Sequence, residues 1–193
     1  VCDVLFGDKS PSGKLTMSMP QNMGQIPVYY NHLNTGRPVE ENTQKFAKFQ
    51  SNYLDVRNEP LYPFGYGLSY TTFAYSNLRV VEGEEFKAGD KIRIAVDIKN
   101  TGDRAGKESV LLFINDDVAS IVPDARRLRD FEKVQIEPGQ TVTVEFEIEA
   151  EELAFAANDG KWHLEEGTFT VQCGNLTEKL TCIETMHFGY NIR

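Results

Sequence analysis

Two segments in the second half of the chain alternate apolar and mostly polar residues, and this pattern constrains the fold more than any other. They are residues 92–99 and 141–149. Their apolar positions are Ile92, Ile94, Val96 and Ile98, then Val142, Val144, Phe146 and Ile148. A period of two is typical of strands with one face toward a core and one toward water. A one-residue shift would bury Glu145, Glu147 and Glu149, so the pattern also fixes the register.

Short apolar segments separated by turn residues fill the rest of this half. The further candidate strands are residues 78–81, 110–114, 131–136, 161–164, 168–173 and 179–183. The turn signals are Asn100, Gly102, Gly106, Pro138–Gly139, Asp159–Gly160 and a hairpin at Gly174–Asn175. About eight short strands in about 115 residues predict a mainly β fold, an immunoglobulin-like or fibronectin type III-like antiparallel sandwich. Residues 110–114 predict a central strand covered on both faces, and residues 151–157 predict one or two helical turns.

The first part of the chain has a different character. Its opening residues predict a short helix that ends at Gly7, then a turn at residues 11–13 and a strand over residues 14–19. From Met19 to about Leu61 no period persists, and glycines and prolines interrupt the chain. We call this stretch the strap, and we expect it to lie on another surface, because its backbone groups need partners. Residues 61–73, which read LYPFGYGLSYTTF and which we call the junction, connect it to the sandwich.

Composition and charge limit the possible partners. The 193 residues are 40% hydrophobic and 11% aromatic, which fits one modest core. A formal net charge of -9 disfavours nucleic acid and anionic membrane surfaces as partners. The sequence contains no signal peptide and no run of 18 apolar residues. Because the chain opens at Val1 inside the expected helix and without a methionine, we expect it to be the tail of a longer polypeptide.

The cysteines and histidines predict no metal centre. Cys2, Cys173 and Cys182 lack the CxxC spacing of a structural zinc site. Cys173 and Cys182 flank the expected hairpin and could oppose each other across two strands. We expect two reduced, partly buried thiols there, with a disulfide as the alternative. The histidines are far apart in sequence and lack helical i, i+4 spacing, so we expect no metal-ligand pair and a structural role for the first of them; they are His32, His163 and His187.

No catalytic constellation is evident, and we assign no catalytic, substrate, cofactor or metal residue. Ser69 lacks the second glycine of a nucleophile elbow. Paired carboxylates occur only as adjacent doublets, for which we expect solvated surface positions, because neighbours on a strand point to opposite faces. The doublets are Glu40–Glu41, Glu84–Glu85, Asp116–Asp117, Glu151–Glu152 and Glu165–Glu166.

Three further features have two interpretations each. Arg126, Arg127 and Arg129 either contact other domains or an anionic group, or form a solvated loop, which we favour. The aromatic residues of the leading part either stack on sugar rings or pack across a domain seam, which we favour. They are Tyr29, Tyr30, Tyr53, Tyr62, Phe64, Tyr66, Tyr70, Phe73 and Tyr75. Trp162 is expected in the sandwich core rather than on a carbohydrate platform, and the Asn175–Leu176–Thr177 sequon matters only in a eukaryotic secretory setting.

Several sequence blocks together resemble a known family. The chain is similar to the C-terminal region of glycoside hydrolase family 3 β-glucosidases, particularly the periplasmic bacterial type. The blocks are DVLFG at 3–7, PSGKL at 11–15, GQIPVYYNH at 24–32, TGRP at 35–38 and YPFGYGLSYT at 62–71. Downstream, NTG at 100–102, FEKV at 131–134, PG at 138–139 and GTF at 167–169 resemble that family's fibronectin type III-like domain. The chain departs from the family at Pro123–Asp124, usually Arg-Pro, and at Asp130, usually glycine.

The resemblance implies a division of the chain and a role for it. Residues 1–75 are expected to be the remnant of an α/β sandwich domain with the linking strap, and residues 76–193 the fibronectin type III-like domain. It implies a parent enzyme, periplasmic or secreted, that hydrolyses β-glucosides with retention through an aspartate on a (β/α)8 barrel and a glutamate on the α/β domain. Neither carboxylate lies in this chain. We therefore expect a non-catalytic clamp for the upstream catalytic domains, with no cofactor, and as the alternative a carbohydrate-binding module.

Overall fold

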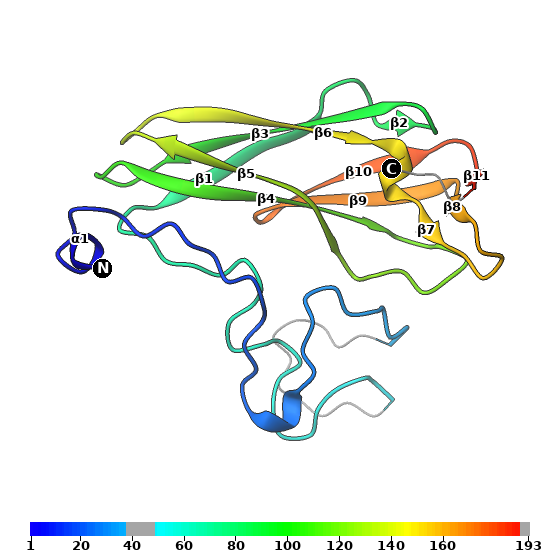
Figure 1. Cartoon of the computed structure of the whole chain (residues 1–193), viewed down its shortest axis with the longest axis horizontal. Helices are drawn as coiled ribbons and strands as arrows, with labels where there is room; N and C mark the ends of the chain where they lie inside the picture. The colour runs from blue at the N-terminus through cyan, green and yellow to red at the C-terminus, as the bar shows by residue number, and fades with distance from the viewer. Residues whose placement is uncertain (38–48, 190–193) are drawn as a thin grey trace.

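The computed structural model describes residues 1–37 and 49–189, and two packed β-sheets dominate it (Figure 1). The larger sheet has the order β2-β10-β9-β4-β5, with bounds Glu85–Phe86, Leu176–Cys182, Gly167–Cys173, Gly106–Asp116 and Arg127–Ile136. The smaller has the order β1-β3-β6, with bounds Phe73–Val80, Lys91–Asn100 and Thr141–Glu149. All pairings in these sheets are antiparallel except that of β2 with β10. The expected fibronectin type III-like sandwich is confirmed.

The alternating segments pair in the register that their pattern predicts. β3 and β6 align Ile92 with Ile148, and Ile94 with Phe146. The apolar members of β3 face the core and are fully or almost fully buried, while Lys91 and Arg93 are exposed. The opposing layer contributes core residues from β4, β9 and β10, among them Val110, Leu112, Ile114, Phe169, Val171 and Leu180. Burial of these side chains is the main source of the sandwich's stability.

A third, small sheet closes one end of the sandwich. It consists of β11 (Met186–Phe188), β8 (Trp162–Leu164) and β7 (Phe155–Ala156), all antiparallel. Trp162 is partly buried and packs against the main core, as expected. The expected helical turns at residues 151–157 are only partly found. A 3-10 helix, η2 (Ala150–Leu153), ends at Leu153, and the extended backbone of Ala154 leads into β7. Leu153 and Ala154 are both buried.

We call residues 1–75 the leading segment, and its described residues contain little regular structure. The helix α1 (Cys2–Leu5) ends before Gly7, as expected, and a 3-10 turn, η1 (Met23–Gln25), lies in the strap. The expected strand over residues 14–19 is wrong, because these residues form only an isolated bridge between Met19 and Tyr62. Below the sandwich, the segment between α1 and the strap runs beside the junction (Figure 1). None of the helices in the described ranges is long and apolar enough to cross a bilayer.

The hairpin at Gly174–Asn175 forms, but it does not bring the two cysteines together. In the β9–β10 pair Cys173 faces Leu176, and Cys182 faces Gly167. All three cysteines lie in the described ranges as free thiols, and Cys173 and Cys182 are buried. The expectation of reduced thiols agrees with this register, whereas the idea that they oppose each other is wrong. Burial raises the pKa of the Cys173 thiol to about 12, so it is an unreactive core residue.

Candidate functional site at the contact of the leading segment with the sandwich

The junction is hydrogen-bonded to the residues for which a strand was expected. The Leu15 amide donates to the Tyr66 carbonyl at 2.8 Å, and the Gly65 amide donates to the Leu15 carbonyl at 2.8 Å. The Met19 amide donates to the Tyr62 carbonyl at 2.8 Å. These bonds join two irregular chains without forming a ladder, because Pro63 offers no donor and Gly65 has a φ of 82°. Residues 15–19 and the junction thus hold each other in place.

Two glycines let the junction approach its neighbours closely. A Cβ atom on Gly65 would lie 2.7 Å from Cδ1 of Leu111 on β4. A Cβ atom on Gly67 would lie 2.5 Å from the Gly13 carbonyl oxygen, a separation that real Cβ atoms do not adopt. The FGYG sequence of the junction therefore reflects packing against both the sandwich and the beginning of the chain.

An aromatic cluster joins the strap, the junction and β4. Tyr30 stacks on Phe64 with ring centroids 4.3 Å apart, and the edges of both meet Phe113, at 6.0 and 6.2 Å. The Arg126 guanidinium lies 5.0 Å from the centroid of the Phe113 ring. Phe113 and Leu111 alternate along β4 with the core residues, so the leading segment covers the outer face of this strand. The expected covering of β4 on both faces is confirmed, and each ring pair adds about 0.5–1.5 kcal/mol beyond burial.

A buried carboxylate ties the leading segment to both sheets. Glu108 on β4 is only 6% exposed. Its Oε1 accepts hydrogen bonds from Lys14 Nζ at 2.9 Å and from the Tyr75 hydroxyl of β1 at 2.8 Å. Burial, and then the charge of Glu108, raise the pKa of the Tyr75 hydroxyl, which therefore stays protonated and donating. Lys14 supplies the positive charge that this carboxylate needs when it is removed from water.

Asn100 joins the end of the junction to the sandwich. The side chain is fully buried, and its Oδ1 accepts from the Thr71 hydroxyl at 2.6 Å and from the Gly102 amide at 3.0 Å. Its Nδ2 donates to the carbonyls of Arg104 and Ile136 at 2.7 and 2.9 Å. All donors and acceptors of this amide are satisfied, which explains why a polar side chain is retained at a buried position.

The described residues of the strap are held by contacts with one another and with the loop before β5. Gln25 is fully buried, and its Nε2 donates to the carbonyls of Arg57, Asn58 and Glu59. The Ala125 amide donates to the His32 carbonyl at 2.8 Å, beside a bridge between Leu33 and Asp124. As expected, the described residues of the strap are irregular in structure and lie against another part of the molecule, here the loop before β5.

The aromatic residues singled out in the sequence lie mostly in these contacts. Tyr62 and Tyr66 pack together at 4.8 Å. The hydroxyls of Tyr53 and Tyr70 donate to the carbonyls of Gln25 and Val4. Phe73 and Tyr75 pack against the core, and Tyr29 is largely exposed.

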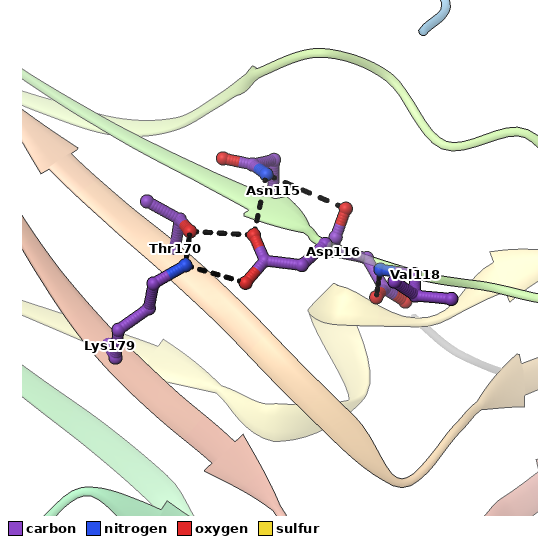
Figure 2. A network of polar contacts seen from close by, with 6 residues as sticks. Asn115, Asp116, Val118, Thr170 and Lys179 are labelled. Carbon is purple, nitrogen blue, oxygen red and sulfur yellow. Dashed lines mark hydrogen bonds and ion pairs between the residues drawn. The ribbon is translucent and has the colours of Figure 1, made fainter. Parts of the chain in front are cut away.

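One acidic doublet differs from the solvated surface expected for it (Figure 2). Asp116 and Asp117 are half-buried at the end of β4. Asp117 accepts hydrogen bonds from the Thr170 hydroxyl at 2.6 Å and from Lys179 Nζ at 2.7 Å. Asp116 accepts from the Val118 amide at 3.1 Å. Burial, followed by the charges of Glu165 and Asp117, raises the pKa of Asp116 to about 6. The two carboxylates have separate partners and do not share a site.

The other acidic doublets are mainly surface residues. Glu84, Glu85, Glu152 and Glu166 are exposed. Glu151 accepts a hydrogen bond from the Gly89 amide, and Glu165 accepts one from the Ser120 amide. The doublet Glu40–Glu41 lies outside the described residues. Ser69, which the sequence already excluded as a nucleophile, has its Oγ 2.8 Å from the Ser10 hydroxyl.

The arginine cluster is not the solvated loop that was favoured. Arg127 is exposed, but Arg127 and Arg129 belong to β5. Arg126 covers Phe113, and Arg129 is largely buried and donates to the Glu152 carbonyl. Burial, and then the charge of Arg127, lower the pKa of Arg129 to about 10. Adjacent basic residues suggested a solvated loop, whereas the Arg126 side chain lies over the ring of Phe113.

The histidines are not all isolated from one another. His32 is exposed, with Nδ1 3.1 Å from the Leu33 carbonyl oxygen. His163 and His187 are brought side by side by the pairing of β8 with β11, with ring centroids 4.1 Å apart. The sequence alone missed this pair, because the contact depends on the register of two short strands.

Comparison with known proteins identifies the family. Residues 1–70 match the glycosyl hydrolase family 3 C-terminal domain, and residues 108–177 match the fibronectin type III-like domain. The chain is 45% identical over 174 residues to a periplasmic beta-glucosidase of Salmonella typhimurium, a match that covers 90% of this chain and 22% of that protein. The chain belongs to glycoside hydrolase family 3. Within that family it corresponds to the C-terminal part of much longer proteins.

Other family 3 proteins also match most of this chain over only a small part of their own length. A putative beta-xylosidase of Formosa agariphila is 37% identical over 89% of this chain and 21% of its own length. The crystal structure of a Listeria innocua beta-glucosidase in complex with gluconolactone has a TM-score of 0.84 at 41% identity, covering 93% of this chain and 25% of that one. A Kluyveromyces marxianus beta-glucosidase has a TM-score of 0.71 at 30% identity, covering 97% and 23%. The chain thus spans no more than a quarter of each of these proteins.

Proposed function

We propose that this chain is the non-catalytic C-terminal part of a periplasmic or secreted β-glucosidase that cleaves β-glucosides with retention. In this proposal the sandwich is a structural clamp. It holds the leading segment, residues 1–75, and the leading segment presents a surface to the catalytic domains of the same polypeptide. Its contribution to catalysis is to position and stabilise those domains. The division of the chain near residue 75, into the leading segment and a fibronectin type III-like sandwich, is part of the proposal.

The distribution of exposed apolar side chains carries the proposal. Large apolar side chains exposed to solvent are concentrated in residues 1–70. Prominent ones are Leu5 at 73%, Phe6 at 79%, Met23 at 88%, Ile26 at 62% and Leu54 at 83% exposure. The sandwich, in contrast, buries its own core. Soluble proteins rarely leave so much apolar surface in contact with water, so these exposed residues of the leading segment are suited to being covered by further protein.

The sugar specificity of the parent enzyme is the finer part of the proposal. The relatives carry both names, beta-glucosidase and beta-xylosidase. The 45% identity to the Salmonella beta-glucosidase supports a glucoside. Turnover of aryl β-glucosides and aryl β-xylosides by the intact polypeptide tests this, and a preference for the xyloside would reverse the assignment.

The clamp is tested by removing it. We expect the chain alone to release no nitrophenol from aryl β-glucosides. We expect the intact polypeptide to lose activity and melting temperature when residues 76–193 are deleted. The Lys9→Met variant of the intact polypeptide, changed at an exposed position, is the control for losses that arise from producing and purifying an altered protein. Unchanged activity and melting temperature after the deletion would refute the clamp, and turnover by the isolated chain would refute its non-catalytic nature.

The alternative, a carbohydrate-binding module, has less support from the surface. Among the large hydrophobic side chains that are exposed in the described residues 76–189, Phe131 is the one aromatic residue. A sugar-binding platform usually needs more than one exposed ring. Titration of the chain with cello-oligosaccharides should therefore give no saturable heat, and a saturable heat would favour the module over the clamp.

A further inference from the structure

Two histidines face each other on the small sheet that closes the sandwich. The β7–β8–β11 pairing places Phe155, His163 and His187 directly opposite one another on three adjacent strands. Opposed residues in an antiparallel sheet project from the same face with their Cβ atoms about 4.5–5.5 Å apart. The imidazole rings of His163 and His187 are accordingly adjacent, with centroids 4.1 Å apart and planes inclined at 60°. This proximity follows from the strand register.

A carboxylate orients the more buried of the two rings. Asp159 Oδ2 lies 3.1 Å from Nε2 of His163, whose side chain is 15% exposed. The carboxylate accepts a hydrogen bond from the Nε2–H tautomer of His163, and in this tautomer the lone pair of Nδ1 is available to a metal ion. A carboxylate behind an imidazole in this way is the usual outer partner of a metal-ligating histidine.

The second ring is exposed and has no competing polar partner. His187 makes the ring contact with His163, and within the described residues no hydrogen bond or ion pair involves its nitrogens. The negative charge of the chain favours a cation near it. In the described part of the chain no three His, Cys, Asp or Glu side chains are grouped to hold a metal ion. A site here therefore has two protein ligands, and water completes its coordination.

We infer that His163 and His187 form a two-histidine chelate for a divalent transition-metal ion, with Asp159 as the positioning residue. Imidazole nitrogen suits Zn²⁺, Ni²⁺ and Cu²⁺, and among these ions Cu²⁺ binds nitrogen sites most tightly. The ion reaches the site from the exposed His187 and connects β8 with β11. The inference is independent of the proposed clamp, since it concerns a different end of the sandwich and needs no catalytic domain.

Copper titration of the whole chain, produced without an affinity tag, tests the site. With one equivalent of Cu²⁺, electron paramagnetic resonance should show coupling to two imidazole nitrogens. The His187→Asn variant should show one nitrogen or none. The matched control is His32→Asn, because His32 is also exposed but stands apart from the pair, and this variant should retain the wild-type spectrum. Zn²⁺ should raise the melting temperature of the wild type but not that of His187→Asn.

The positioning residue gives a second and milder test. The Asp159→Asn variant should keep both nitrogens in the spectrum and bind Cu²⁺ about 10–100-fold more weakly, since only the orientation of His163 is lost. Circular dichroism verifies that each variant is folded. A two-nitrogen spectrum that survives His187→Asn, loss of the signal in His32→Asn, or the absence of stoichiometric binding in the wild type would each overturn the inference.

Discussion

Gly67 is a residue at which a single methyl group should disturb the contact between the junction and the beginning of the chain. Its missing Cβ would lie 2.5 Å from the Gly13 carbonyl oxygen, a backbone atom that cannot turn aside. We expect Gly67→Ala to destabilise the junction by about 1–3 kcal/mol, the usual cost of overpacking. Hydrogen exchange of the Leu15 and Gly65 amides, which are bonded across this contact, measures the effect.

The control for this prediction is Gly13→Ala. A Cβ atom at Gly13 would meet nothing within 4 Å, so this variant adds the same methyl group in open space. Its amide exchange should match that of the wild type. Equal protection of Leu15 in the Gly67→Ala and Gly13→Ala variants would show that the close approach does not constrain the junction.

Asp116 should make the stability of the chain depend on pH. Its pKa is raised from 3.8 to about 6, mainly by burial, so the folded state binds the proton more tightly than the unfolded state. The linkage relation then gives a free energy of unfolding that decreases as pH rises from about 4 through 6. The penalty is absent at low pH and complete above pH 6.

The variant Asp116→Asn should remove this dependence, because its amide oxygen can still accept the Val118 bond but carries no charge. We expect a higher melting temperature than the wild type at pH 8 and a much smaller difference at pH 4. Asp103→Asn, at an exposed position, is the control for loss of one negative charge. A difference between wild type and Asp116→Asn that stays constant from pH 4 to pH 8 would contradict the assignment.

For individual residues, the sequence predicted well which side chains face the core, but it predicted poorly which side chains contact each other. Ile92 to Ile98 follow their alternation, since burial of one face depends only on local periodicity. Asp116 and Arg129 were expected in solvent, because residue type indicates average exposure and not position in a fold. His163 and His187 could be paired only once the register of β8 and β11 was known.

The attachment of the leading segment to β4 is the central feature at the scale of elements, and Lys14 tests it. The Lys14→Met variant leaves the buried Glu108 carboxylate with the Tyr75 hydroxyl but without its cation. We expect a loss of about 1–3 kcal/mol, the cost of an unsatisfied buried group. Urea denaturation and hydrogen exchange of the junction amides measure it.

A matched variant and a double mutant test whether the stability loss in Lys14→Met comes from the unpaired Glu108 carboxylate. Lys9→Met removes an ion pair with Asp3 that is largely exposed, and it should cost at most about 1 kcal/mol. Adding Glu108→Gln to Lys14→Met removes the unpaired charge and should recover part of the loss, which a double-mutant cycle quantifies. Strictly additive effects of the two changes would show that Lys14 and Glu108 are not coupled.

Errors in the predicted elements have identifiable physical causes. β1 begins at Phe73 and not at residue 78, because a bulge between Ser76 and Arg79, with Asn77 at a φ of 54°, interrupts its alternation. Residues 14–19 resemble a strand, but their neighbour is the glycine-rich junction. The 3-10 helix η2 is shorter than expected because Leu153 and Ala154 are both drawn into the core. In each case a tertiary contact overrode the local pattern.

For the molecule as a whole, the structure predicts where an independent sandwich begins. Thr71 bonds to Asn100, and Phe73 pairs with Asn100 in the β1–β3 register. A fragment of residues 71–193 should therefore fold cooperatively and melt at a higher temperature than a fragment of residues 76–193. Differential scanning calorimetry of the two fragments gives the comparison. Equal melting temperatures would place the boundary at residue 76, as the sequence suggested.

The covering of the outer face of β4 has a consequence for domain shuffling among related enzymes. A sandwich grafted from another family member would bring its own counterparts of Glu108, Leu111 and Phe113, but it would meet a recipient junction shaped for different ones. Exchange of the β domain alone should thus give poorly assembled chimeras. A crossover placed upstream of Val1, which transfers both partners of this contact together, should preserve it.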